Sequence, residues 1–180
     1  MIKTHFKVCF SFYRGVFMDT TVCYIKRENI FPEQFLFIYR NKKKNDINHG
    51  KNIGIGGHLE CNETPYMCNK REVFEETGLE LIKSTYLGLV IFSDVSISEQ
   101  RFLMHVYFSD SYEGSEILSE CEEGELNWLT VDQFLMGPHF EGDEYFLEYA
   151  FRGEFFGVVE LVYNSNCLTK IIHNGRLAKL

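Results

Sequence analysis

The sequence predicts a single α+β domain in which strands dominate and two or three helices are present. Three observations favour this class. The chain has 180 residues, which suits one domain of ordinary size. Hydrophobic residues make up 45% of it and charged residues 24%, a balance typical of packed globular proteins. Runs rich in β-branched and aromatic residues recur along the chain between short polar turns.

The first predicted elements are two strands and a helix. Residues Thr20 to Lys26 and Gln34 to Arg40 have strand composition, and we expect these two strands to pair with each other. Thr64 and Pro65 predict a helix start, because the hydroxyl can cap free N–H groups and the missing proline N–H costs nothing there. Gly78 predicts the end of this helix.

The second half of the chain predicts more strands, one helix and a terminal hairpin around Asn164 to Asn166. The pattern alternates as strands do, except where DEYFLEYAF indicates a helix. The expected strands are Leu81 to Phe92, Arg101 to Ser109, Leu126 to Thr130, Phe155 to Tyr163 and Cys167 to Ile172, and the helix is Asp143 to Phe151.

Composition excludes several classes of partner. Lys plus Arg number 18 against 26 Asp plus Glu, a net charge of -8, which repels a nucleic acid backbone. No apolar run reaches the roughly 18 residues of a membrane helix. Six cysteines include no CxxC pair, so we expect reduced thiols and a cytoplasmic location. We therefore expect no nucleic acid polymer and no membrane as partner, and either a monomer or a homodimer.

The ends of the chain are expected to lie outside the main domain. Arg14 interrupts the apolar stretch near the start and no small-residue cleavage site follows, so no signal peptide is predicted. Residues 1–17 are either a lead-in strand or a leader that precedes the domain. We place the domain at residues 18–172 and a C-terminal tail at residues 173–180.

The predicted helix after Thr64 carries an unusual cluster of acids. Glu72, Glu75 and Glu76 are spaced i, i+3, i+4 and share one face, while Tyr66, Met67, Val73 and Phe74 are expected to form the packing face. A solvated acidic face is the ordinary explanation. However, like charges at i, i+4 cost about 0.2–0.5 kcal/mol, and a divalent cation such as Mg²⁺ would reverse that cost.

Two neighbouring groups bear on a metal site. The turn Gly54 to Gly57 lets the backbone approach a ligand closely and can lend a carbonyl. His58, Cys61 and Cys68 could suggest zinc, but a fourth ligand and the usual paired spacing are absent from the sequence. A hard cation held by carboxylates is therefore favoured over zinc.

The segment from Gly57 to Leu79 resembles the Nudix box: Gly57, five residues, Glu63, seven residues, then REVFEETGL. Outside the box, YRNKKKND, GKNIGIGGHLE, PHFEGDEYF and EFFGVVELVY resemble the MutT-type branch of Gram-positive 8-oxo-dGTP diphosphatases. The resemblance implies an α/β/α sandwich with a mixed sheet. It also implies a hydrolase for nucleotide pool sanitation, linked to DNA repair, that releases a nucleoside monophosphate and pyrophosphate.

The resemblance also implies roles for residues of the box. Glu72, Glu75, Glu76 and the carbonyl of Gly56 would hold Mg²⁺ or Mn²⁺. Glu63 and Arg71 would act as a catalytic pair that orients those ligands. Glu76 would also be catalytic.

A loop glutamate completes the implied catalytic set. Glu122, counted back from Trp128, would serve as general base and metal ligand, with Glu123 as the alternate because one-residue slips are easy in such loops.

Substrate contacts are implied by the segments outside the box. Phe140 would stack on the base and Asp143 would hydrogen-bond its edge, with Trp128 and Phe156 as further stacking candidates and Glu141 as a further polar one. Arg40 and His49 would contact phosphate or sugar.

Other functions stay open at this point. Asn52 and Ile53 differ from the residues that relatives use near the base. A Nudix hydrolase of ADP-ribose or of a nucleotide sugar is therefore one alternative to the small-molecule nucleoside triphosphate substrate, and a catalytically silent ligand-sensing Nudix module is another.

Overall fold

A computed structural model of the chain describes residues 17–44, 46–96, 101–114, 121–165 and 167–179. Within these ranges the chain forms strands and helices in the following order: β1 (Phe17–Ile25), β2 (Gln34–Tyr39), β3 (Asn52–Ile53), α1 (Pro65–Thr77), β4 (Glu80–Asp94), β5 (Arg101–Glu113), β6 (Glu125–Thr130), α2 (Val131–Met136), α3 (Asp143–Arg152), β7 (Gly157–Asn164), β8 (Cys167–His173) and β9 (Arg176–Lys179).

The described strands form two sheets. The larger sheet has the order β1-β5-β4-β7-β8-β9, and the smaller one has the order β3-β2-β6. In the larger sheet β1 runs parallel to β5 and β4 runs parallel to β7, whereas the other pairs are antiparallel. Together with the three helices, these pairings confirm the predicted α+β class and its mixed sheet.

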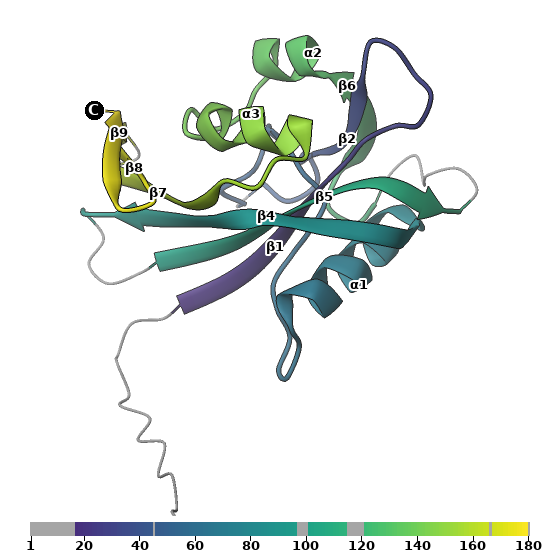
Figure 1. The fold of residues 1–180 in the computed structure, drawn as a ribbon, viewed down its shortest axis with the longest axis horizontal. Coiled ribbons are helices and arrows are strands. Elements are labelled where there is room, and N and C mark those ends of the chain that lie inside the picture. Colours follow the sequence, from purple (N-terminus) through teal and green to yellow (C-terminus); the bar gives the residue numbers. More distant parts are fainter. Residues whose placement is uncertain (1–16, 45, 97–100, 115–120, 166, 180) are drawn as a thin grey trace, which may run out of the picture.

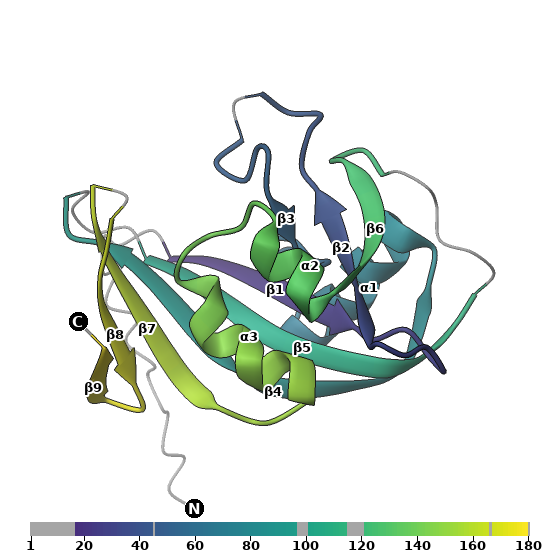
Figure 2. The ribbon, with the colours of Figure 1, turned by 90° about the horizontal axis from the view of Figure 1, so that it is seen from above.

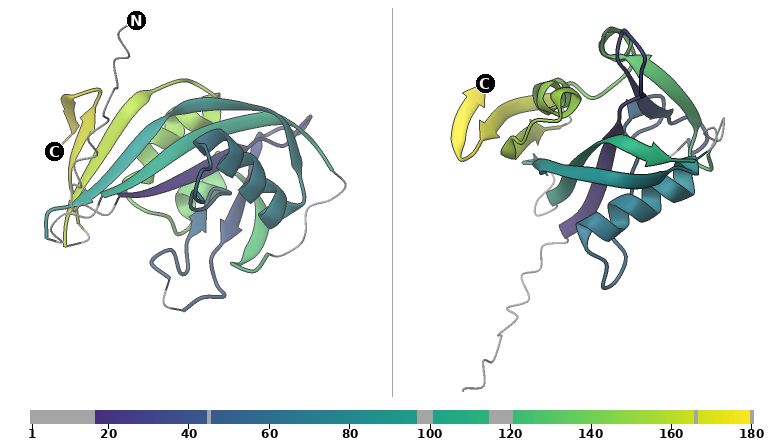
Figure 3. Two further views of the ribbon diagram at one scale, coloured as in Figure 1. Left: turned by 90° about the horizontal axis from the view of Figure 1, so that it is seen from below. Right: turned by 45° about the vertical axis from the view of Figure 1, so that its right-hand side comes forward.

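The helices lie on two sides of the larger sheet, with α1 on one side and α2 and α3 on the other (Figure 1). The same separation appears when the ribbon is seen from above and from below (Figures 2 and 3). Alternation along β1 explains it, since Val22 and Tyr24 enter the core beside α3, while Cys23 and Ile25 enter the core beside α1. The sandwich therefore has a core on each side of the sheet.

The predicted pairing of the first two strands is wrong. Strand β1 pairs along its whole length with β5 instead, and β2 lies in the smaller sheet between β3 and β6. The two strands meet at a bridge between Lys26 and Phe35 and through the Arg27 N–H, which donates to the Gln34 carbonyl (2.8 Å). Neighbouring strands in sequence pair in only about two thirds of cases, and both faces of each of these strands are buried, which suits separate sheets.

Helix α1 begins and ends at the predicted residues. The Thr64 hydroxyl accepts a hydrogen bond from the Met67 N–H (3.3 Å), and Pro65 is the first helical residue. Gly78 has φ +75°, a left-handed conformation that strains other residues. The two sequence signals at the helix ends are thus confirmed.

The predicted packing face of α1 is largely wrong. Tyr66, Met67 and Phe74 are exposed. Val73 is fully buried, and the buried residues that accompany it are Cys68, Asn69, Glu76 and Thr77. The buried side of α1 consists mostly of polar residues. A search for apolar residues therefore placed the packing face on the wrong side of the helix.

Several elements were not predicted. Helix α2 follows Thr130, whose hydroxyl accepts from the Gln133 N–H (3.2 Å) while the Gln133 side chain accepts from the Thr130 N–H. Strand β3 and strand β9 are also additional, and β9 lies in the segment expected as a tail. The predicted leader, apart from residue 17, lies outside the described residues. No helix among the described residues is long and apolar enough to cross a membrane.

We predict that Phe37→Ala strongly destabilises the protein. The Phe37 side chain is fully buried and stacks on Phe134 with ring centroids 4.6 Å apart. Its removal should lower the free energy of unfolding by about 3–5 kcal/mol, measured by urea denaturation. Phe155→Ala is the control, because Phe155 is 70% exposed and should change stability by about 0.5 kcal/mol or less. Equal losses of unfolding free energy in the two variants would contradict the burial of Phe37.

Candidate functional site

A glycine turn before α1 is fixed by strand β1. The Thr21 N–H donates to the Gly57 carbonyl (2.8 Å) and the Cys23 N–H donates to the Ile55 carbonyl (2.7 Å). A Cβ on Gly56 would lie 2.1 Å from the Thr21 carbonyl oxygen. A Cβ on Gly57 would lie 2.5 Å from the Glu72 carboxylate. At Gly56 the clash is with backbone, so only glycine fits there, whereas at Gly57 the end of the Glu72 side chain would have to move. The backbone turn therefore lies directly against the acidic helix.

Arg71 is the centre of the ion-pair network on α1. Its guanidinium holds Glu63 through two bonds, Nε to Oε1 (2.9 Å) and Nη2 to Oε2 (2.8 Å). Its Nη1 also donates to Glu72 (2.7 Å) and Glu75 (3.1 Å), and Nη2 donates to the His58 carbonyl (3.1 Å). The box residues that the sequence groups together are therefore brought into contact through one cation.

The bonds from Arg71 set the charge of Glu63. They lower the pKa of Glu63 from 4.5 to about 2, because bonds from a cation favour the ionised carboxylate. The same carboxylates raise the pKa of Arg71 above its ordinary value. Glu63 and Arg71 are consequently a permanently charged, bidentate pair.

Glu76 has a different environment from Glu72 and Glu75. It is only 7% exposed, and its Oε2 accepts a hydrogen bond from the Gly56 N–H (3.0 Å). Burial raises its pKa from 4.5 to about 8, against a lowering by the Gly56 bond and by the charge of Arg40. Glu75 lies at the other extreme, with a side chain that is 57% exposed.

The donor set fits a hard divalent cation, with one rearrangement. Carboxylate oxygens from Glu72, Glu75 and Glu76 and the backbone of Gly56 lie on one side of α1, and Mg²⁺ and Mn²⁺ prefer such oxygen ligands. Among the described residues no three acidic, histidine or cysteine side chains already converge on one point. A cation would therefore compete with Arg71 for Glu72 and Glu75.

The two candidate loop glutamates differ in their contacts. Glu122 is exposed and lies beside Cys121, whereas Glu123 forms ion pairs with Arg40 and with Lys43 (3.2 Å). The charges of Glu76 and Arg40 both act on the Cys121 thiol, so this loop lies beside the buried end of the acidic face. Of the two, Glu123 is the one that contacts a cation near Glu76.

Arg40 and His49 do not share an environment. Arg40 is 8% exposed and its Nε donates to Asp46 (2.8 Å) in addition to the ion pair with Glu123. His49 is exposed in the loop of residues 41–51, and its backbone N–H donates to the Asp46 carbonyl (3.0 Å). Sequence reasoning missed Asp46 as the partner of Arg40. The signal in the sequence is that Asp46 is the one acid in a lysine-rich loop, which favours an ion pair.

The two main base-binding candidates lie close together at the start of α3. Phe140 is half-buried, and the Lys51 ammonium lies 4.4 Å from the centre of its ring. Asp143 is 8% exposed, and burial raises its pKa to about 7, with His139, the Phe140 N–H and Lys51 acting in the opposite direction. Sequence reasoning missed Lys51, whose charge bears on both candidates.

The remaining candidates for base binding are less suitable. Phe156 is 3% exposed and packs in the core against Phe146 and Tyr149, so the expectation that it stacks on a ligand is wrong. Trp128 is half-buried with the Arg27 guanidinium 5.4 Å from its ring centre. Glu141 is exposed.

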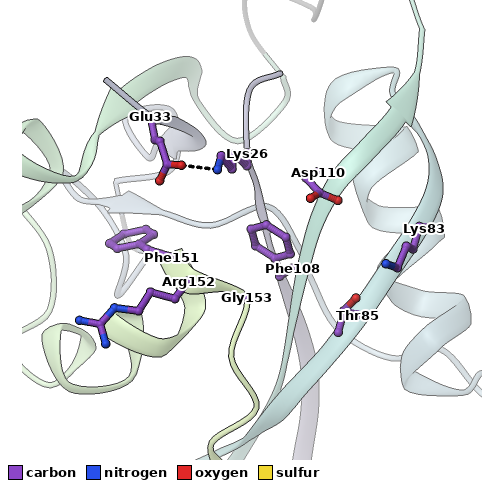
Figure 4. Close-up of a pocket in the computed structure, with 9 residues that line it drawn as sticks. All are labelled: Lys26, Glu33, Lys83, Thr85, Phe108, Asp110, Phe151, Arg152 and Gly153. Atoms are coloured by element: carbon purple, nitrogen blue, oxygen red, sulfur yellow. Dashed lines mark hydrogen bonds and ion pairs between the residues drawn. The ribbon is translucent and has the colours of Figure 1, made fainter. Parts of the chain in front are cut away.

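A pocket of about 610 Å³ lies apart from the acidic helix. It opens where β1, β4 and β5 approach the C-terminal end of α3, between Phe108 and Phe151 (Figure 4). It is lined by both positively and negatively charged side chains, and Lys26 forms an ion pair with Glu33. The pocket is lined by none of the candidate catalytic, metal-binding or substrate-binding residues that the sequence indicates. Its lining residues are Lys26, Glu33, Lys83, Thr85, Phe108, Asp110, Phe151, Arg152 and Gly153.

Comparison with known proteins places this geometry in context. The family model described as the NUDIX domain matches residues 17–150. An uncharacterized Nudix hydrolase, YvcI, from Bacillus subtilis is 33% identical over 106 residues, which is 57% of this chain and 65% of that protein. The oxidized purine nucleoside triphosphate hydrolase of Danio rerio is 30% identical over 91 residues, 51% of this chain and 56% of that protein. The chain therefore spans less than two thirds of these relatives.

A solved structure shares the fold. The MutT protein from Bacillus halodurans superimposes with a TM-score of 0.72 at 20% identity, covering 87% of this chain and 97% of that one. At this identity the likeness concerns the fold alone. It agrees with the mixed sheet and the helices on its two sides.

We predict that Glu63→Gln destabilises the protein in a pH-dependent way. The variant loses one charge of a bidentate pair, which should cost about 1–3 kcal/mol at pH 7. Because the folded pKa of Glu63 is lowered, the contribution is present above the ordinary value and disappears as the pH falls towards 2. Urea denaturation at pH 7 and pH 3.5 should show the difference from the parent narrowing. Glu148→Gln, in an exposed pair with Arg152, should lose about 0.5 kcal/mol or less.

We predict the opposite sign for Glu76→Gln in the absence of metal. The folded state holds the Glu76 proton up to about pH 8, so the free energy of unfolding of the parent falls as the pH rises from about 4.5 towards 8. The glutamine cannot ionise and can still accept from the Gly56 N–H. Its melting temperature should exceed that of the parent by about 4 °C or more at pH 8 and by little at pH 5. A variant that melts at or below the temperature of the parent at both pH values would contradict the raised pKa of the buried Glu76 carboxyl.

Proposed function

The chain belongs to the Nudix family, and we propose that it is a divalent-cation-dependent pyrophosphohydrolase of nucleoside triphosphates, with oxidised purine nucleotides such as 8-oxo-dGTP as preferred substrates. The products would be a nucleoside monophosphate and pyrophosphate. We assign this activity to a domain of residues 18–172 and expect it in nucleotide pool sanitation. Nudix hydrolases act on phosphorus anhydrides and generally use divalent metal ions.

The observation that carries the proposal is the contact between the glycine turn and the acidic face of α1. Glu72 lies against Gly57, and Glu76 accepts a bond from the Gly56 N–H, so the carboxylates of the helix lie directly against the backbone of the turn. A catalytically silent module would have no need of three acids that repel one another on one face. The retained carboxylates therefore favour an enzyme.

The chemistry needs negative charge to be neutralised near phosphorus. A bound Mg²⁺ or Mn²⁺ would polarise phosphoryl oxygens and position the attacking water, and we assign it to Glu72, Glu75, Glu76 and the Gly56 carbonyl. The residues Glu63 and Arg71 hold the helix carboxylates in place. Such supporting groups commonly contribute 10- to 100-fold to metal affinity or activity.

A loop glutamate would take the proton of the attacking water. The segment that contains Glu122 and Glu123 lies beside Glu76, as the shared electrostatic environment of Cys121 indicates. We therefore keep the general base in this segment.

Recognition of the purine is assigned to the start of α3. Asp143 is a buried carboxyl and Phe140 is an adjacent aromatic ring. An 8-oxo purine carries an N7–H donor that the unmodified base lacks, and a buried acceptor would discriminate between the two because an unpaired polar group in a site is costly. The similarity to the oxidized purine nucleoside triphosphate hydrolase of Danio rerio supports the proposed class of substrate.

We predict that the purified protein with Mg²⁺ releases pyrophosphate from 8-oxo-dGTP with a kcat/KM at least about 10-fold above that for dGTP, because loss of one buried hydrogen bond costs on the order of 1–3 kcal/mol. The assay measures pyrophosphate across oxidised and unmodified nucleotides, ADP-ribose and nucleotide sugars. Glu75→Gln removes an exposed metal ligand and should lower kcat at least about 100-fold without a change in melting temperature.

The panel separates the possible failures. Comparable kcat/KM values for dGTP and 8-oxo-dGTP would refute the sanitising role and leave the hydrolase standing. Turnover of ADP-ribose or a nucleotide sugar alone would replace the substrate class. Full activity of Glu75→Gln at saturating Mg²⁺ would refute the metal site.

A further inference from the structure

The pocket between Phe108 and Phe151 lies apart from every residue assigned to the proposed hydrolase site. It adjoins the C-terminal end of α3 (Figure 4), whereas the proposed base-binding residues lie at the start of that helix. Helix α3 has 10 residues, so its two ends are about 15 Å apart. Phe108 packs against the core beside α3, on the opposite side of the larger sheet from α1. The pocket is therefore a separate candidate site.

One wall of the pocket is held in place by the aromatic core. The Phe151 ring packs against four other rings, with centroid distances of 4.6 Å to Phe35, 6.0 Å to Tyr24, 6.1 Å to Phe134 and 6.3 Å to Phe37. Close packing of this kind fixes a side chain in one orientation. The wall formed by Phe151 is thus present before any ligand binds.

The opposite wall is an aromatic ring without an aromatic partner. Phe108 is half-buried and makes no ring contact with another side chain in the described part of the chain. A Cβ on Gly153 would lie 3.2 Å from the Phe108 ring, so the backbone at the end of α3 lies close against that ring. The cavity of about 610 Å³ has the size of pockets that hold small ligands, roughly 300–1,000 Å³. The unpartnered ring therefore borders a space large enough for a ligand ring to stack on it.

One cation and one anion of the lining are available to a ligand. Lys26 is paired with Glu33, and Arg152 points away from the cavity (Figure 4). The Lys83 ammonium on β4 and the Asp110 carboxylate on β5 both line the pocket and are exposed. Within the ranges that the structure describes, neither group forms an ion pair or a hydrogen bond. A ligand for this pocket should therefore carry an aromatic ring, an anionic group and hydrogen-bond donors.

We propose that this pocket is a second nucleotide site, which binds a ribonucleoside monophosphate. The base would stack on Phe108, the ribose hydroxyls would donate to the Asp110 carboxylate, and the phosphate would accept from the Lys83 ammonium. The inference goes beyond the proposed function, because this binding needs neither the cation site on α1 nor any hydrolysis. No covalent bond changes in it.

The lining favours this class of ligand over related ones. Stacking suits any base, because every base has a flat π face. A carboxylate is a suitable acceptor for ribose hydroxyls, a role that acidic residues have in dinucleotide-binding domains. One free ammonium matches one phosphate, whereas a triphosphate would bring further negative charge towards Asp110 and Glu33 that Lys83 alone does not neutralise. A free base would leave Lys83 and Asp110 without partners.

The first test uses AMP as the probe, in metal-free buffer, and follows the backbone amide resonances of the isotope-labelled full chain by NMR. The resonances of Thr85 and Gly153, which line the pocket, should shift and saturate as AMP is added, and their titration gives the Kd. Shifts confined to Gly56 and Gly57, beside the acidic helix, would mean that AMP binds only at the hydrolase site and would overturn the inference. Absence of any shift would overturn it as well.

The second test removes the stacking ring. Phe108→Leu should weaken AMP binding in the pocket at least about fivefold, as expected for the loss of one base–aromatic stack. Phe155→Leu is the matched control, because Phe155 is 70% exposed and does not line the pocket. It should change the Kd less than twofold. Equal Kd values in the two variants would contradict stacking on Phe108.

The third test assigns the two charged groups with related probes. Lys83→Met should weaken AMP binding severalfold and leave adenosine binding unchanged, because adenosine has no phosphate. Lys170→Met, which alters an exposed lysine on β8 outside the lining, is its control. The parent should bind AMP severalfold more tightly than deoxy-AMP, and Asp110→Ala should abolish that difference.

The outcomes are decisive even if the Phe108 variant is poorly folded. Melting temperatures report the fold of each variant, and Lys83 and Asp110 are exposed, so their substitution should leave the fold intact. AMP affinities that neither Lys83→Met nor Asp110→Ala alters would overturn the site. Selective losses in these two variants would support it even if the protein hydrolyses no nucleoside triphosphate, and failure of the site would leave the proposed hydrolase untouched.

Discussion

Mutual repulsion of the carboxylates on α1 is the constraint to which the rest of the site conforms. Glu72 and Glu75 share the guanidinium of Arg71, while Glu76 is buried against the backbone of Gly56. Glu63 fixes Arg71 from outside the helix with two bonds. A single cation thus holds Glu63, Glu72 and Glu75 together without neutralising them all, and the remaining negative charge would favour the divalent ion of the proposed site.

The features that the sequence predicts best are local ones. The start and end of α1 depend on Thr64 and Gly78, whose effects reach only one helical turn. The pairing of Glu63 with Arg71 was implied by the resemblance to the Nudix box, and it joins residues only eight positions apart. The capping box at Thr130 and Gln133 is equally local, and attention to the pattern T-x-x-Q would have predicted α2 as well.

The features that the sequence does not predict depend on contacts between distant segments. Strand β1 finds its partner about 80 residues later in β5, and composition alone cannot distinguish that partner from β2. The burial of Glu76 requires the glycine turn to cover it, and the burial of Arg40 requires both Asp46 and Glu123. Each of these polar groups looks solvent-exposed in the sequence because its counter-charge or hydrogen-bond donor lies elsewhere in the chain.

Strand β3 connects the proposed base-binding region to the acidic helix. The Asn52 N–H donates to the Pro138 carbonyl (2.8 Å), which ties β3 to the loop before Phe140 and Asp143. Two residues further on, the chain enters the glycine turn whose Gly56 N–H contacts Glu76. A shift of the base-binding loop would therefore displace the glycine turn and, through it, a carboxylate of the cation site. Because β3 is only two residues long, the proposed base-binding region and the proposed cation site are joined by a very short piece of backbone.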